Sequence, residues 1–178
     1  YVYDGEDIVL AFDEDAELTN RYLHGPAVDQ VLADEQYGAT NHDDPAEDEG
    51  IVYWPLTDNL GSVRQLVTSD GEEAKRIEYD SFGQMTVVSG AVDHIFGYTG
   101  REHDAESHLQ FNRARYYDAA LGRWLSEDPL GFAAGDANLF RYVFNSATIL
   151  VDPSGLEFGL FGSTYYWPWE DEAHFGLE

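Results

Sequence analysis

The stretch RARYYDAALGRWLSEDP, residues 113–129, carries the pattern that decides the fold. Within it, Tyr117-Asp118 is followed by Gly122 and then by an extended segment, and Asp58 and Asp80 begin the same order of Asp, Gly and extended segment. Asp58 and Asp80 lie 22 residues apart, which is about the length of one β-hairpin per repeat. The repeat therefore predicts consecutive hairpins whose neighbours complete a shared core.

Strand signals dominate the rest of the chain. Short β-branched or aromatic runs are punctuated by Gly, Asp, Asn and Pro, as is typical of antiparallel sheets. Asp70-Gly71 between two such runs indicates a hairpin turn, and only residues 133–144 suggest a short helix or turn. We therefore expect a mainly β fold, with strands at residues 8–12, 21–24, 28–32, 51–54, 62–67, 76–79 and 84–88.

The charge of the chain is extreme, at -26, because nine basic residues face 35 acidic ones. Phosphate backbones would be repelled, so we expect no nucleic-acid partner. Most of this charge is best interpreted as a solvated surface. The acidic stretch 34–50 is expected to be a loop without core residues.

Composition also restricts the chemistry. The absence of Cys excludes disulfides, Cys–zinc sites and thiol nucleophiles. No apolar run approaches the roughly 18 residues of a membrane span, and no signal peptide is visible. The chain begins at Tyr1 rather than Met, which suggests a piece of a longer protein.

Metal and cofactor signals are weak. Counted from Asp13, the acidic run has Leu18 at the sixth position and His24 at the twelfth, where an EF-hand loop needs Gly and Glu. His103 and His108 are five residues apart, a spacing that is not distinctive. We expect no metal site and no cofactor.

Arginines are grouped in the second half. Five of the eight fall between residues 101 and 141, which in so acidic a chain suggests internal ion pairs or an organised site. These five are Arg101, Arg113, Arg115, Arg123 and Arg141.

Two Asp-Pro-x-Gly elements stand close together, at 128–131 and at 152–155. Pro fixes φ and Gly permits positive φ, so each element offers a carboxylate on a turn of restricted shape. If the fold brings Asp128 and Asp152 together, the pair can share a proton and hydrolyse a peptide bond without metal, Ser or Cys. The alternative is that each Asp only caps its own turn through nearby backbone N–H groups.

The Asp…Gly repeats, the stretch 113–129 and the two Asp-Pro-x-Gly elements, taken in their order along the chain, resemble the core of the Rhs/YD-repeat family. The resemblance implies β-strands that spiral into a hollow shell, closed at one end by a turn-rich Rhs-associated core plug. It divides the chain into a YD-repeat β segment at 1–100, the Rhs-associated core at 101–156, and a tail or start of a variable effector region at 157–178. The resembling stretches are 21–26, 58–64, 78–83, 96–102, 113–129, 138–142 and 151–156.

The same resemblance implies a single-turnover aspartyl autoprotease. Asp128 and Asp152 would be the catalytic pair, Arg123 a supporting cation, and Leu156–Glu157 the cleaved bond. Its partners would be the remainder of its own shell and an enclosed C-terminal toxin or peptide, with secretion machinery or a cell-surface partner in addition. A secreted or cell-surface location follows from the family.

Two other functions stay open. Eukaryotic teneurins share the YD shell and use it for adhesion, so the shell alone also fits a non-enzymatic structural or adhesive module. The many Tyr and Trp residues could instead bind carbohydrate or a partner. The aromatic run at 165–169 fits either a docking peptide inside the shell or ordinary core packing of a following domain.

Overall fold

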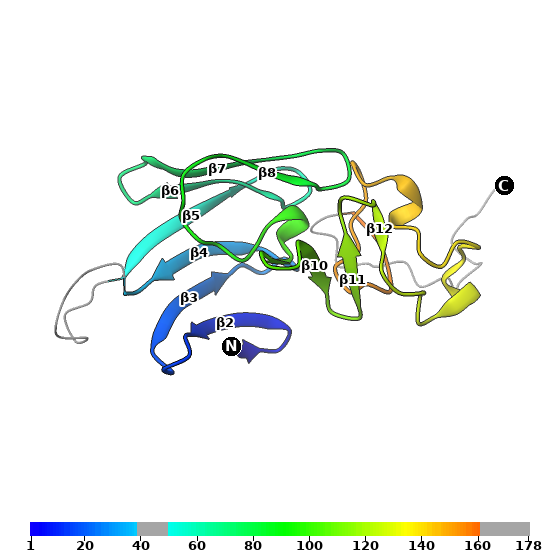
Figure 1. Cartoon of the computed structure of the whole chain (residues 1–178), viewed down its shortest axis with the longest axis horizontal. Coiled ribbons are helices and arrows are strands. Elements are labelled where there is room, and N and C mark those ends of the chain that lie inside the picture. The colour runs from blue at the N-terminus through cyan, green and yellow to red at the C-terminus, as the bar shows by residue number, and fades with distance from the viewer. Residues whose placement is uncertain (39–49, 161–178) are drawn as a thin grey trace.

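The computed structural model describes residues 1–38 and 50–160, and they form a mainly β structure with two antiparallel sheets. The larger sheet is a meander of eight strands in sequence order, which Figure 1 shows as one curved layer. Each strand pairs with the next one along the chain, as hairpin repeats require. The strands are β1 (Val2–Asp4), β2 (Asp7–Phe12), β3 (Leu18–His24), β4 (Val31–Gln36), β5 (Ile51–Thr57), β6 (Val63–Thr68), β7 (Glu73–Tyr79) and β8 (Met85–Ser89).

The second sheet lies beside one end of the first (Figure 1) and is followed by turn-rich chain. Its four short strands run in the order β12-β11-β10-β9. They are β9 (Glu102–Asp104), β10 (Leu109–Asn112), β11 (Arg115–Asp118) and β12 (Arg123–Trp124). Three short 3-10 helices complete the described chain: η1 (Tyr98–Gly100), η2 (Gly131–Ala134) and η3 (Val143–Asn145).

The Asp…Gly repeats build turns of the same design. Asp58 Oδ1 accepts hydrogen bonds from the backbone N–H groups two and four residues later, at 2.9 and 3.0 Å. Asp80 Oδ1 does the same at 2.9 Å for both bonds. The carboxylate thereby satisfies N–H groups that the tight turn leaves without a strand partner. The predicted hairpin repeat is confirmed.

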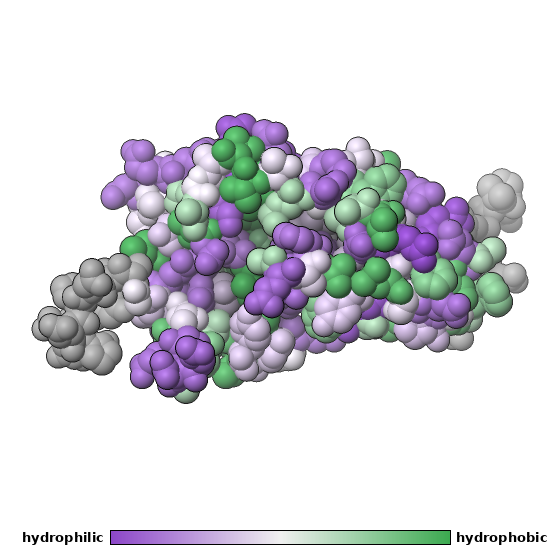
Figure 2. Space-filling view, viewed as in Figure 1, coloured by the Kyte–Doolittle hydropathy of each residue, from purple (hydrophilic) through white to green (hydrophobic). Residues whose placement is uncertain are grey.

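Two apolar clusters hold the sheets. One lies on a face of the large sheet and contains Ile8, Ala11, Tyr22, Val31, Val63, Leu66 and Phe96. The other lies at the second sheet and centres on Tyr117, Trp124 and Tyr142, whose rings are 4.3–5.6 Å apart between centroids. Ring pairs at these distances add to the burial of their apolar surface. On the face shown in Figure 2, hydrophilic and apolar side chains are intermixed.

One local prediction, the start of the acidic loop, was wrong. Residues 34–36 belong to β4 rather than to a loop, and Asp34 is fully buried, where it accepts hydrogen bonds from Asn20 and Gln36. Residues 133–144, expected to hold a short helix or turn, form turns whose two ends lie in η2 and η3. Residues 39–49 of the acidic stretch and the aromatic run at 165–169 lie outside the described residues.

Candidate functional site

Asp128 and Asp152 converge on one guanidinium, that of Arg115. Arg115 Nη2 lies 2.9 Å from Asp128 Oδ2 and 3.5 Å from Asp152 Oδ2. Arg115 opens β11, and its guanidinium carbon lies 4.2 Å from the centroid of the Trp124 ring. All three charged side chains are almost buried, with exposed fractions of 3% for Arg115, 9% for Asp128 and 5% for Asp152.

Each aspartate also caps its own turn. Asp128 Oδ1 accepts a hydrogen bond from the backbone N–H of Leu130 at 2.8 Å. Asp152 Oδ1 accepts one from Leu156 at 3.2 Å and another from the Ser154 hydroxyl at 3.2 Å. In each aspartate one carboxylate oxygen accepts the hydrogen bonds of the turn and the other faces Arg115, so turn capping coexists with the approach of both aspartates to Arg115.

Burial gives Asp152 an unusual acidity. Desolvation raises the pKa of the Asp152 carboxyl to about 7, against the opposing effects of Arg115, the Ser154 hydroxyl and the backbone N–H groups of Gly155 and Leu156. The same desolvation lowers the pKa of Arg115, although both aspartates favour its charged form. A carboxyl that retains its proton near neutral pH can act as a general acid.

A pocket of about 290 Å³ opens beside the two aspartates. Its lining includes Arg115, Asp128 and Asp152 together with Leu156 and Glu157. The backbone N–H of Glu157 donates a hydrogen bond to Ser154 Oγ at 3.1 Å. The structure therefore brings the predicted pair of aspartates and the predicted cleavage residues to one pocket.

Arg123 is placed elsewhere. It is exposed, its guanidinium carbon lies 4.5 Å from the centroid of the Phe140 ring, and it is not among the residues that line the pocket. Sequence reasoning chose Arg123 from family position and missed Arg115 as the cation beside the aspartates. The available signal was the grouping of arginines, which by itself does not rank one member above another.

The other residues considered as metal ligands in the sequence are not grouped into a metal site in the described part of the chain. His103 and His108 have ring centroids 6.2 Å apart, but among residues 1–38 and 50–160 no three His, Asp or Glu side chains are grouped as metal ligands. Asp13 Oδ1 accepts hydrogen bonds from the N–H groups of Asp15 and Glu17, as in the other Asp turns. Within the same described ranges, no helix combines the length and apolar character that a membrane crossing needs.

Comparison with known proteins identifies the family. The family model described as "Teneurin YD-shell" matches residues 37–146. The toxin subunit YenC1 of Yersinia entomophaga is 41% identical over 110 residues, which cover 58% of this chain and 11% of YenC1. The toxin protein Tse5 of Pseudomonas aeruginosa is 34% identical over 112 residues, covering 63% of this chain and 8% of Tse5. An uncharacterised Escherichia coli protein, YibJ, is 36% identical over 101 residues, covering 56% of this chain and 42% of YibJ.

The solved structures agree with the sequence relatives. A crystal structure of TcdB2-TccC3-Cdc42 is similar with a TM-score of 0.64 and 25% identity, covering 83% of this chain and 7% of that one. The chain thus spans less than half of the curated relatives it matches. Because the family model covers more than half of the sequence and the fold agrees, the chain belongs to the Rhs/YD-repeat shell family.

Proposed function

We propose that this chain is the C-terminal core of an Rhs-type encapsulating shell that closes the cage and cleaves itself once, after Leu156. The cut would free an enclosed C-terminal toxin or peptide. The observation that supports this most strongly is the meeting of Asp128 and Asp152 at Arg115, in the pocket that Leu156 and Glu157 also line. Several relatives are toxin proteins by name, which supports the toxin context.

The two aspartates take different roles in the proposed reaction. Asp152 holds a proton because burial raises its pKa to about 7, so it donates that proton to the carbonyl oxygen of Leu156. Asp128 acts as the base, and its Oδ2 lies 2.9 Å from Nη2 of Arg115. Such an asymmetric pair avoids two adjacent negative charges.

The bonds balance with one water molecule. Asp128 accepts a proton from water while the water oxygen bonds to the carbonyl carbon of Leu156, which gives a neutral tetrahedral diol. The C–N bond then breaks as Asp128 passes its proton to the nitrogen of Glu157 and the diol returns a proton to Asp152. The products are a carboxylic acid at Leu156 and an amine at Glu157, and both aspartates recover their starting states.

Confinement supplies much of the rate in this proposal. The substrate is the same chain, so no encounter with a separate molecule is needed. The Ser154 hydroxyl, which accepts the N–H of Glu157 at 3.1 Å, orients the leaving nitrogen. The partners would be the remainder of its own shell and the released effector, and the location would be secreted or at the cell surface, as for a toxin component.

A non-enzymatic scaffold is the second candidate. It is favoured by one specific observation: both aspartates already satisfy their turns through Oδ1. A capped turn stabilises the shell whether or not any bond is cut.

The mass of the purified full-length protein separates the two functions. We expect a break after Leu156 in the wild type and an intact chain in Asp128→Asn and in Asp152→Asn, since Asn keeps the Oδ1 acceptor and loses the proton chemistry. Asp118→Asn is the matched control, because Asp118 Oδ1 caps a turn in the same way, accepting the N–H of Leu121 at 3.0 Å. A wild-type chain that stays intact from pH 4 to pH 8, or variants that are cut as fast as the wild type, would refute self-cleavage.

A further inference from the structure

Four consecutive residues bind four consecutive carbonyl groups just before the proposed cleavage site. The side chain of Asn112 donates to the carbonyl oxygen of Asp152 at 2.6 Å, and that of Arg113 to Pro153 at 2.7 Å. The backbone N–H of Ala114 donates to Ser154 at 3.1 Å, and Arg115 Nε donates to Gly155. Every pair is separated by 40 residues, so the two segments lie in one register. We call residues 112–115 the clamp.

The clamp holds its target at very close range. A Cβ added to Gly155 would lie 2.5 Å from the carbonyl oxygen of Asn112 and 3.0 Å from the backbone nitrogen of Arg115. Asn112 is fully buried, and its side-chain oxygen accepts a hydrogen bond from Gln110 at 2.9 Å. A slip of the 152–155 segment by one residue would bring a side chain against this backbone and break all four hydrogen bonds.

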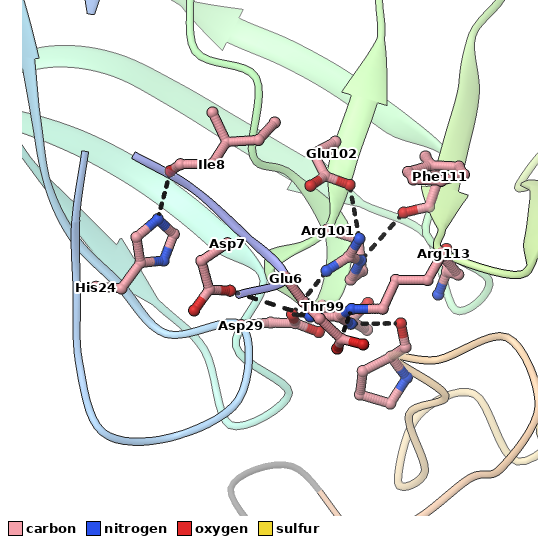
Figure 3. Close-up of polar contacts among 12 residues, drawn as sticks. Glu6, Asp7, Ile8, His24, Asp29, Thr99, Arg101, Glu102, Phe111 and Arg113 are labelled. Carbon is pink, nitrogen blue, oxygen red and sulfur yellow. Dashed lines mark hydrogen bonds and ion pairs between the residues drawn. The ribbon is translucent and has the colours of Figure 1, made fainter. Parts of the chain in front are cut away.

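A buried ion cluster fixes the clamp to the large sheet, as Figure 3 shows. Arg113 Nη2 donates to Asp29 Oδ1 at 2.9 Å, and Arg101 Nη1 donates to the same oxygen at 2.7 Å. Asp29 lies in the connection between β3 and β4 and its side chain is 1% exposed. Arg113 therefore joins the large sheet on one side to the carbonyl of Pro153 on the other.

The backbone of Arg113 indicates that its side chain matters. Arg113 and Ala114 form the two-residue turn between β10 and β11, and Arg113 has a φ of 56°, a left-handed conformation that favours Gly. Conformations of this kind persist where surrounding contacts compensate for them, and they are concentrated at functional positions. The contacts of its side chain to Asp29, Pro153 and Glu6 provide that compensation.

We propose that the clamp sets the register of residues 152–156 against Asp128 and Asp152, with Arg113 and Asp29 as positioning residues for self-cleavage. The catalytic part of this inference rests on the proposed function, whereas the clamp itself does not. All four clamp bonds lie on the N-terminal side of Leu156. After the cut, the clamp therefore keeps the new C-terminus in the site, which limits the site to one turnover, whereas none of the four clamp bonds holds the segment that begins at Glu157.

Two readouts on the full-length protein test the proposal. The first is hydrogen exchange of the amides of Leu156 and Glu157 in the uncleavable Asp128→Asn background. Arg113→Gly retains the turn, because Gly prefers its backbone conformation, yet removes the side chain's hydrogen bonds to Asp29 and Pro153 together with its ion pairs to Glu6 and Asp7. We expect exchange to become about tenfold faster or more in Arg113→Gly, and unchanged in the control Arg21→Gln, which removes an exposed ion pair with Glu35 in the same large sheet.

The second readout is cleavage in the wild-type background. Arg113→Gly should slow the cut about tenfold or more and add products cut at neighbouring bonds, while the pH midpoint of the rate stays unchanged because Asp128, Asp152 and Arg115 are untouched. Arg113→Lys should recover part of the rate, since an ammonium can keep some of the contacts of the guanidinium but not all of them. Asp29→Asn, which suits the positive φ of 57° at that residue, should weaken the clamp in the same direction.

The outcomes distinguish the two ideas. Unchanged exchange in both Arg113→Gly and Asp29→Asn would overturn the clamp. Faster exchange with an unaltered rate and cleavage position would overturn the positioning role. If the wild type is never cut, the proposed function and this positioning role both fail, and the exchange result alone decides whether the clamp exists.

Discussion

The two Asp-Pro-x-Gly turns have the same pattern but differ in their surroundings. In the first, Pro129 and Leu130 are exposed, and a Cβ added to Gly131 would have no atom within 4 Å. In the second, Pro153 and Gly155 are buried against the clamp. Both glycines have positive φ, at 59° and 69°, so the local backbone requirement is the same.

This difference shows what a turn motif specifies. The motif determines the local backbone and provides a capping carboxylate in both places. Burial comes from residues far away in the sequence, and it is burial that raises the pKa of Asp152. The same motif thus forms an exposed turn at 128–131 and a buried turn at 152–155, and the proposed cleavage site directly follows the buried one.

Arg115 connects the two turns, and its removal should have the largest effect on stability. Arg115→Gln leaves two nearly buried carboxylates without their shared cation, which typically costs about 3–5 kcal/mol. The pKa of Asp152 should rise further, because Arg115 is the strongest influence that lowers it. Urea unfolding measures the loss of stability. Arg123→Gln is the control and should change little, since Arg123 is exposed and stacks on Phe140; equal losses in both variants would contradict the assignment of Arg115.

Substituting alanine for Gly131 and for Gly155 should destabilise the protein to different extents, because only the second turn is tightly packed. Gly131→Ala meets only the left-handed backbone cost of about 1–2 kcal/mol. Gly155→Ala meets that cost and also overlaps the backbone of Asn112 and Arg115, for a total of about 2–5 kcal/mol. Chemical denaturation of both variants tests this expectation. A Gly155→Ala protein as stable as Gly131→Ala would mean that the second turn is not tightly held.

The pH dependence of stability should differ between wild type and Asp152→Asn. In the unfolded chain the Asp152 carboxyl loses its proton near its ordinary pKa of 3.8, whereas in the folded protein it keeps the proton until about pH 7. The folded state therefore binds more protons between these values, so this residue makes stability fall as pH rises, by up to about 1.4 kcal/mol per pH unit, and the fall ends above pH 7. Asp152→Asn should remove that fall.

Asp136 provides a control, because its pKa is shifted in the direction opposite to that of Asp152. Its hydrogen bond with Arg141 lowers the pKa of Asp136, so its contribution is present above about pH 4 and is lost as the pH falls further. Asp136→Asn should therefore change the stability profile only at the acid end. Parallel profiles for wild type and Asp152→Asn between pH 4 and pH 7 would show that the second turn is not as desolvated as described.

The large sheet was predictable because its strands follow local rules. Short β-branched or aromatic runs, separated by turn residues, predicted seven of its strands, including the pairing across Asp70-Gly71. The predicted strand boundaries were wrong where a polar side chain is buried. Residues 34–36 were predicted to begin an acidic loop, yet Asp34 is hydrogen-bonded inside the protein. Local hydrophobicity cannot distinguish such a carboxylate from a solvated one.

The second sheet and the site depended on contacts between distant segments. Its strands bury Gln110, Asn112 and Arg115, so their pattern looks polar rather than alternating. The family resemblance drew attention to Asp128 and Asp152, but only the fold places Arg115 between them and Arg123 outside. Which arginine pairs with which carboxylate is a property of packing that spacing does not reveal.

The third position of each turn gives the smallest expected difference. In the second turn Ser154 Oγ accepts the N–H groups of Leu156 and Glu157, both at 3.1 Å, whereas the equivalent Leu130 is 44% exposed. Ser154→Ala removes these acceptors and should cost about 1 kcal/mol, while Leu130→Ala should cost almost nothing. Ser154→Ala should also raise the pKa of Asp152, because the hydrogen bond from the Ser154 hydroxyl lowers that pKa. Urea titration and the carboxyl resonance of Asp152 measure the two effects, and a Ser154→Ala protein that matches Leu130→Ala in both would mean that the hydroxyl contributes nothing to the second turn.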